Sequence, residues 1–298
     1  MKVFVAGGTG VIGRHAVPAL VAAGHEVTAL SRSTEKDAQV QRAGAHPIRV
    51  DLFDPDALAR AVDGNDAVVN LTTHIPDLSR AARRTAWTEN DRIRTEGSSN
   101  LAAAAVRAEA TRFVQESITF PYADNGAAWI DEDHPRPSSP ITASVDRAEA
   151  SAASVTAAVV LRFGQFYAPD ASHTQAFAAL VRKRLNPFVG PPDAHISFIG
   201  MPAAARAVVA ALTAVPGVYN IVDDDPPTRR EAGETVAAAL GKRRPLSLPM
   251  AVVKPVNPSA ELLARSQRVD NRRYRAATGW EPDHAGAAGP AQAVAEVV

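Results

Sequence analysis

The chain has 298 residues, of which 46% are hydrophobic, 21% charged and 5% aromatic. This length and apolar fraction exclude a disordered or fibrous chain and suggest one large domain or two unequal, interlocked ones. Basic and acidic residues number 32 each, so the formal net charge of zero provides no basic field for nucleic acid or an anionic membrane. Cysteine is absent, which excludes disulfides and cysteine-bound metals. We expect a cytoplasmic globular protein without signal peptide, membrane span or metal.

Short apolar strands alternate with alanine-rich helices over the first two thirds of the sequence. Strands that are apolar throughout and separated by helices predict an α/β fold with a doubly wound parallel sheet. The predicted strands are Val3–Ala6, Glu26–Leu30, Pro47–Val50, Ala67–Leu71, Arg112–Glu116, Ala158–Phe163 and Val218–Val222. The predicted helices include Ala16–Ala23, Asp56–Val62, Arg94–Arg107, Val145–Val155, Ala203–Ala214 and Arg229–Leu240.

The alternation loosens after Phe163, where prolines and glycines surround fewer helices. We predict that residues 1–167 form the sheet domain, with residues 203–224 returning to it. Residues 168–202 and 225–298 would then form a smaller lobe. The acidic, proline-rich stretch Asp131–Pro137 predicts an exposed loop, and its adjacent residues rarely converge on one metal ion.

A glycine-rich turn, Gly7-Gly8-Thr9-Gly10-Val11-Ile12-Gly13, joins the first predicted strand to a helix that opens at about Val11. Glycines let the backbone approach a pyrophosphate closely, and a helix amino end presents free N–H groups to the anion. The strand–turn–helix context makes a dinucleotide site the favoured interpretation over an empty turn. The expected contacts are Gly7, Gly10, Val11, Ile12 and Gly13.

The end of the second predicted strand distinguishes the two nicotinamide dinucleotides. A site selective for NAD places a carboxylate there, whereas this chain has Ser31 and Arg32. An arginine can bind a 2′-phosphate with two hydrogen bonds, so NADP is favoured over NAD, unless Arg32 is an ordinary surface residue. Asp51 and Leu52 are expected at the adenine. Further expected cofactor contacts are Asn70, Leu71 and Thr72, where the fourth strand ends.

With these motifs the chain resembles the extended and atypical short-chain dehydrogenase/reductases, in the epimerase/dehydratase branch. The resemblance extends over nearly the whole length and implies a Rossmann domain with a substrate-facing lobe. Besides the glycine turn, it rests on Asp51-Leu52, Arg112-Phe113-Val114, Leu161-Arg162-Phe163-Gly164-Gln165-Phe166-Tyr167-Ala168-Pro169 and Gly217-Val218-Tyr219-Asn220-Ile221.

The sequence departs from this family at the catalytic positions. The family carries Tyr-x-x-x-Lys on one helix, where the lysine lowers the pKa of the tyrosine for proton transfer. Ile141 and Val145 occupy those positions here, and neither can carry a proton. Ile118 occupies the position of the family's hydroxyl residue, between Ser117 and Thr119.

Polar residues that follow the carboxyl ends of strands are the candidate replacements. Tyr122 is the first candidate for a proton donor, and its alternative is a packed wall residue. His74 can act as a base or be structural. Arg94 can bind a substrate anion or form a salt bridge, and Arg268 resembles a substrate-lobe arginine or forms a surface pair. The predicted catalytic set is Tyr122, Ser117, Thr119, His74 and Tyr167.

Three functions fit this pattern. The first is an NADP-dependent reductase or epimerase/dehydratase-type enzyme, acting on a small organic substrate such as a sugar or secondary metabolite, with a different proton relay. The second is a regulatory protein that senses NADP(H) without turnover, and the third is a non-redox lyase or cyclase. A homodimer is a further expectation, whereas nucleic acid and membrane partners are not expected.

Overall fold

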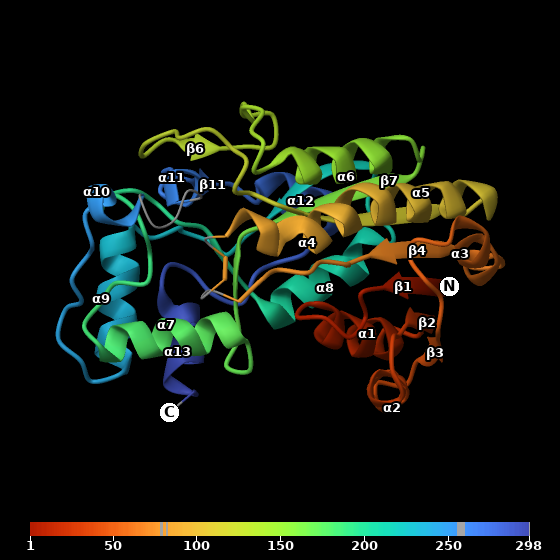
Figure 1. The fold of residues 1–298 in the computed structure, drawn as a ribbon, viewed down its shortest axis with the longest axis horizontal. Coiled ribbons are helices and arrows are strands. Elements are labelled where there is room, and N and C mark those ends of the chain that lie inside the picture. Colours follow the sequence, from red (N-terminus) through yellow and green to blue (C-terminus); the bar gives the residue numbers. More distant parts are fainter. Residues whose placement is uncertain (78–79, 82, 255–259, 298) are drawn as a thin grey trace.

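The centre of the molecule is a parallel sheet of seven strands in the order β10-β7-β5-β4-β1-β2-β3 (Figure 1). The structure is a computed structural model that describes residues 1–77, 80–81, 83–254 and 260–297. It confirms the predicted doubly wound α/β fold. The strands are β1 (Lys2–Ala6), β2 (Glu26–Leu30), β3 (His46–Ile48), β4 (Ala67–Asn70), β5 (Arg112–Ile118), β7 (Ala158–Phe163) and β10 (Gly217–Ile221).

Helices cover both faces of this sheet because each central strand is buried on both sides. Val3 and Val5 of β1 belong to one hydrophobic cluster, while Phe4 between them belongs to another. The first cluster packs under α1 (Gly13–Ala22) and α8 (Met201–Ala211), and the second under α3 (Pro55–Val62), α5 (Ser98–Arg107) and α6 (Ala143–Ala153). In the described part of the chain, no helix is long and apolar enough to cross a membrane.

Within residues 1–167, two helical segments differ from the prediction. Helix α2 (Thr34–Arg42) was not predicted, because Val40 is its only buried residue and the sequence therefore shows no apolar period. Its start is fixed by Ser33, whose hydroxyl accepts a hydrogen bond from the Lys36 N–H. The single helix predicted over 94–107 is instead a π-helical turn, η2 (Ile93–Gly97), followed by α5. It is preceded by a short 3-10 helix, η1 (Arg84–Trp87), and by α4 (Thr88–Arg92), which were not predicted.

The remaining elements form a lobe at one end of the sheet. β8 (Gln165–Tyr167) pairs with β9 (Phe198–Gly200), and β6 (Trp129–Ile130) pairs with β11 (Arg268–Val269). β10 returns to the main sheet as predicted. β6 comes from the segment assigned to the sheet domain, so that part of residues 1–167 lies with the lobe. The lobe helices are α7 (Ser172–Arg182), α9 (Arg229–Ala239), α10 (Met250–Val253), α11 (Ala260–Leu263) and α13 (Ala288–Ala295), and α12 (Arg272–Thr278) packs beside β10.

Candidate functional site

The turn after β1 depends on its glycines. Gly7 has a φ of +83°, and a Cβ there would lie 2.6 Å from the carbonyl carbon of Leu71. A Cβ on Gly13 would lie 2.1 Å from the Gly7 oxygen. Helix α1 therefore starts in direct contact with the turn, as close helix–strand packing in a dinucleotide site requires.

Free backbone donors lie at this turn. The N–H groups of Val11 and Ile12 make no hydrogen bond to any described part of the chain. Val11 is 45% exposed, and the first turn of α1 carries no acidic residue. The positive end of the helix therefore faces open space with unpaired donors, which fits the pyrophosphate of a dinucleotide.

Arg32 follows β2, and Arg49, which follows β3, contacts helix α2 between these strands. Arg32 is exposed, whereas the Ser31 hydroxyl is buried and donates its hydrogen bond to Asp37. Arg49, which the sequence analysis missed, donates to Thr34 Oγ1 at 2.8 Å and binds Asp37. Hydrogen bonds from Arg49 and Ser31 hold the pKa of Asp37 below its ordinary value. Asp37 is therefore a carboxylate whose charge Arg49 neutralises. The Ser31 hydroxyl uses its proton in the hydrogen bond to Asp37.

Asn70 fixes the loop that approaches the glycine turn. Its buried amide donates to Ser98 Oγ at 3.1 Å and to Gln115 Oε1 at 2.9 Å, and its oxygen accepts the Thr72 N–H at 3.1 Å. These bonds hold Leu71, whose carbonyl group touches Gly7. Asn70, Leu71 and Thr72 thus shape the predicted cofactor site.

Asp51 and Leu52 lie in the turn after β3. The Asp51 carboxylate accepts the Phe53 N–H at 2.9 Å, and the Leu52 carbonyl accepts the Asn100 amide at 3.1 Å. The turn is therefore fixed in place, and its contact with adenine stays a prediction.

The two substituted catalytic positions differ in exposure. Ile141 is 37% exposed just before α6, whereas Val145 is 4% exposed and packs inside. An alkyl side chain at either position cannot transfer a proton. The described structure also contains no lysine between Lys36 and Lys183, because the sequence has none there.

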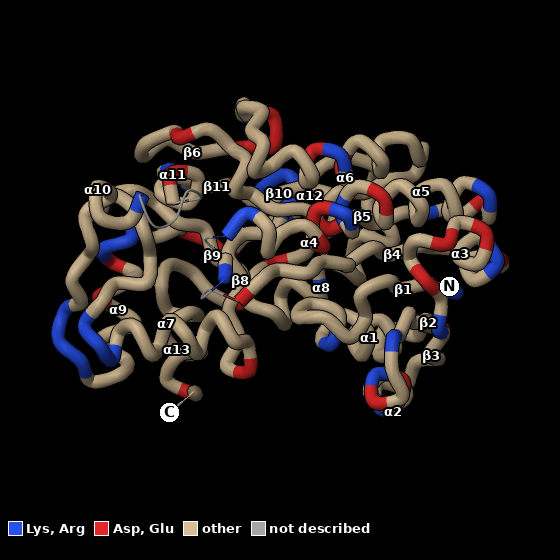
Figure 2. Tube along the Cα trace, in the orientation of Figure 1, with Lys and Arg blue, Asp and Glu red and all other residues tan. Residues whose placement is uncertain are grey.

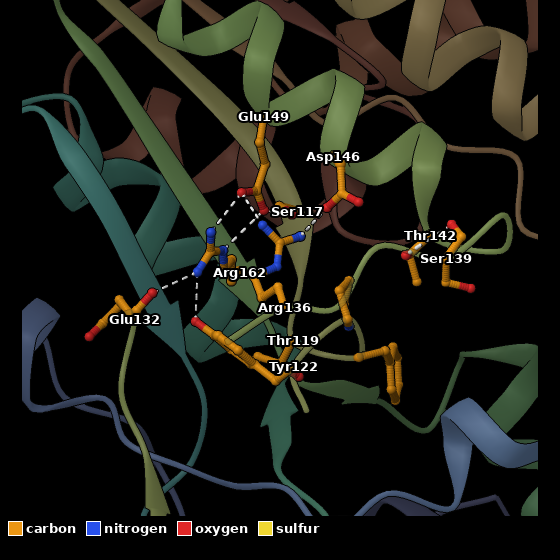
Figure 3. A network of polar contacts seen from close by, with 12 residues as sticks. Ser117, Thr119, Tyr122, Glu132, Arg136, Ser139, Thr142, Asp146, Glu149 and Arg162 are labelled. Carbon is orange, nitrogen blue, oxygen red and sulfur yellow. Dashed lines mark hydrogen bonds and ion pairs between the residues drawn. The ribbon is translucent and has the colours of Figure 1, made fainter. Parts of the chain in front are cut away.

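A buried ion network lies one turn further along α6 (Figure 3). Glu149 accepts the Ser117 hydroxyl at 2.5 Å and binds Arg162 at 2.7 Å and Arg136 at 2.5 Å. Burial raises the pKa of Glu149, but the hydrogen bonds and charge of Arg162, with Arg136 and Ser117, outweigh it, so the pKa lies below its ordinary value. Glu149 is thus a carboxylate that orders its neighbours. The signal in the sequence is Arg162, a charge within an apolar strand.

Tyr122 belongs to the same network and has no exposed surface. Its hydroxyl donates to Asn220 Oδ1 at 2.8 Å and accepts from Arg162 Nη1 at 2.8 Å. Burial raises the pKa of the phenol, although Arg162 opposes the shift. The burial of Tyr122 fits the alternative in which this residue packs in a wall of the site. It does not support the predicted role of Tyr122 as a proton donor.

The other predicted catalytic residues lie apart. Tyr167 is buried in the lobe, where its hydroxyl donates to Asp223 at 2.7 Å. Thr119 is buried, and its N–H donates to the Phe163 carbonyl at 3.0 Å. His74 is exposed after β4, with its N–H bonded to Asn90. The structure therefore brings Ser117 and Tyr122 into one network and leaves Tyr167 and His74 outside it.

The structure also places Arg94, Arg268 and the acidic loop Asp131–Pro137. Arg94 is buried and pairs with Glu116 at 3.0 Å, which is its salt-bridge interpretation. Arg268 stacks over the Trp129 ring at 4.1 Å. The loop Asp131–Pro137 is not wholly exposed as predicted: Glu132 is buried and accepts the Asn220 N–H at 2.9 Å. In the described residues no group of acidic and histidine side chains could hold a metal ion.

The sequence model described as the NAD dependent epimerase/dehydratase family matches residues 3–221. The chain belongs to this family. It is 32% identical to the "3-diazoavenalumate denitrifying reductase" of a Streptomyces species, over 95% of this chain and 97% of that protein. This family member is thus similar over nearly its full length to a reductase.

Solved structures agree with this membership. The human epimerase family protein SDR39U1, crystallised with NADPH, is 29% identical, with a TM-score of 0.83 and full coverage of both chains. The enzyme WbmG of Bordetella bronchiseptica, in complex with NAD, is 20% identical, with a TM-score of 0.77 over 100% of this chain and 96% of that one. The second likeness shows the fold alone. A nicotinamide dinucleotide cofactor is thus supported, and the choice between NADPH and NAD is left open.

Proposed function

We propose that this protein is an NADPH-dependent reductase of a small aromatic substrate, at a centre whose reduction takes no proton from the protein. The proposal rests on one combination of features: the glycine turn for the cofactor is intact, and the family's proton-transfer couple is missing from the catalytic positions. Gly7 and Gly13 keep the geometry of the turn, while Ile141 and Val145 replace the family's proton-transfer couple.

The preference for NADPH rests on the segment after β2. Arg32 is exposed there, and Arg49 binds Asp37 in α2, the helix that follows. Two guanidinium groups suit a 2′-phosphate, and the Asp37 carboxylate is already neutralised by Arg49. Val11 and Ile12 would bind the pyrophosphate with their free N–H groups.

Aromatic diazonium ions are the substrate class that fits this edge. Bound NADPH would supply a hydride, which with an aromatic diazonium gives the arene, N2 and NADP⁺, so atoms and charges balance without an added proton. Ketone reduction, epimerisation and dehydration each require a positioned acid or base, and the buried Tyr122 and the neutral Ile141 provide none. The protein would contribute orientation, which is its main task in hydride transfer.

The similarity to the Streptomyces reductase supports this choice. Its printed name describes a reductase that removes nitrogen from a diazo compound, and the similarity extends over 95% of this chain. A reaction of that kind needs the family's dinucleotide site but does not need the tyrosine and lysine of its Tyr-x-x-x-Lys motif.

The test uses purified protein, an arenediazonium salt and NADPH deuterated at C4. We expect protein-dependent loss of NADPH absorbance, release of N2, and deuterium on the arene carbon that carried nitrogen. A reaction without protein measures direct reduction, and a matched aryl ketone should not react. Ketone reduction with no diazonium turnover would contradict the proposal.

Two further outcomes correspond to the alternative functions. NADPH binding without turnover of any substrate would favour a sensor. Conversion that is indifferent to NADPH would favour a lyase.

A further inference from the structure

Two short basic segments lie side by side at the outer end of the lobe. Arg182, Lys183 and Arg184 end helix α7, and Lys242, Arg243 and Arg244 follow α9. The two segments are joined through their backbones: the Leu246 N–H donates to the Arg184 carbonyl at 2.8 Å, and the Asn186 N–H donates to the Leu246 carbonyl at 2.9 Å. Six exposed cations therefore share one surface, which we call the basic tip.

The charge of the basic tip is little neutralised. Within the described residues, Arg244 pairs with Glu234 at 2.9 Å, and the other five cations form no ion pair. Cations stabilise the carboxyl ends of helices, but this role extends only over the last turn. Arg182 alone lies in such a turn, and α9 has no basic residue in its own. The helix dipole therefore does not account for the remaining cations.

Exposed aliphatic side chains adjoin the basic tip. Leu246 is 62% exposed, Leu248 46% and Val252 57%. Leu246 and Leu248 lie between Arg244 and α10, and Val252 lies in α10 itself. Cations next to exposed alkyl groups are typical of surfaces that bind the interface of an anionic bilayer.

The position of the basic tip favours a flat partner. In Figure 2 both basic segments lie at the left end of the molecule's longest axis, beyond α7 and α9. The strand β1 and helix α1, which form the cofactor turn, lie toward the other end. A projecting end can meet a planar surface without steric conflict, whereas a peptide helix usually binds in a groove.

We propose that the basic tip binds membrane surfaces that contain anionic phospholipids. This departs from the expectation drawn from the net charge, because a sum over the chain hides cations that lie some sixty residues apart in sequence and adjacent in space. The proposal is independent of the reductase function. Lys and Arg would contact the headgroups, and Leu246 and Leu248 would enter the interface.

The test is co-sedimentation of the full chain with vesicles of phosphatidylcholine, with and without phosphatidylglycerol. We expect binding only to the anionic vesicles, and weaker binding at high salt because the attraction is screened. The variant K242Q/R243Q/R244Q should lose at least about tenfold in binding. The variant R42Q/R60Q/R107Q removes equal charge from exposed sites elsewhere and should bind as the wild type does. Retained NADPH binding verifies the fold of each variant.

Three results would overturn the proposal. The first is no preference for anionic vesicles, and the second is an equal loss in the control variant, which would indicate net charge alone. The third is that the variant L246S/L248S binds anionic vesicles as well as the wild type does and that polyglutamate fully displaces the vesicles. The basic tip would then be a site for acidic peptides.

Discussion

The glycine turn after β1 keeps the features of its family, whereas the edge formed by β5, α6 and β7 departs from them. At the turn, backbone geometry is preserved, with Gly7 and Gly13 in contact with neighbouring carbonyl groups. At the edge, Ile141 and Val145 occupy the positions of the family's proton-transfer couple, and the ion network of Glu149 and its arginines lies one turn further along α6. We therefore propose that this chain retains cofactor binding without the family's proton-transfer couple.

The largest expected effect is loss of stability on removing Glu149. The substitution Glu149→Ala leaves the buried Arg162 without its carboxylate partner and removes one of the two carboxylates that pair with Arg136, which costs about 3–5 kcal/mol of unfolding free energy. Urea denaturation measures this, with Glu96→Ala at an exposed pair as the control, expected within about 0.5 kcal/mol. A small effect at Glu149 would show that the network does not support the edge.

Asp223 tests how a buried carboxyl behaves when its partner is a phenol rather than arginines. Burial raises the pKa of Asp223 to about 7, opposed by the hydrogen bond from Tyr167. A pKa raised by folding stabilises the protein below the unfolded value, and this stability is lost as pH rises through the folded value.

Wild-type unfolding free energy should therefore fall between about pH 4 and about pH 7, by at most about 4 kcal/mol. Asp223→Asn should remove that dependence, whereas Asp225→Asn, at an exposed site, should keep it. Parallel pH curves for wild type and Asp223→Asn would contradict this interpretation.

At the turn, we expect Gly13→Ala to weaken NADPH binding by more than about a hundredfold. The added Cβ would lie 2.1 Å from the Gly7 oxygen, so α1 has to move away from the turn. Gly24→Ala is the matched control, because that glycine has a φ of +84° and no neighbour within 4 Å. It should cost about 1 kcal/mol of stability and leave binding intact. Fluorescence titration with NADPH distinguishes the two.

The smallest expected effect concerns cofactor choice. Arg32→Asp should weaken NADPH about tenfold or more and NADH little, because only NADPH carries the 2′-phosphate that the carboxylate repels. Arg49→Gln should act in the same direction and also free the Asp37 carboxylate. Equal weakening of both dinucleotides by Arg32→Asp would mean that this segment does not select between them.

The sequence predicts what depends on local patterns. Val3–Ala6 and its glycine turn follow from apolar runs and a required backbone conformation, and all seven strands of the sheet were placed within two residues at either end. Helix α2 was missed because it buries one side chain. The network of Ser117, Glu149 and Arg162 could not be derived, because its members come from three elements and meet only through the fold.

Charge was the least informative property of the sequence. The composition of Asp131–Pro137 predicts a solvent-exposed loop. Glu132 is nevertheless buried, because the Asn220 N–H and Arg273 compensate its charge. Likewise, the sequence allows Arg94 to bind a substrate anion or to form a salt bridge, and the structure shows that it pairs with Glu116. Such outcomes depend on partners distant in the chain.

The inward packing of Val145 has a consequence for protein engineering. Because Val145 is 4% exposed, a lysine at this position would enter an interior that is already packed, so grafting the family's Tyr-x-x-x-Lys pair onto this scaffold requires rebuilding the contacts of α6 as well. Directed evolution toward alcohol oxidation should therefore start from the helix interface and add the phenol afterwards.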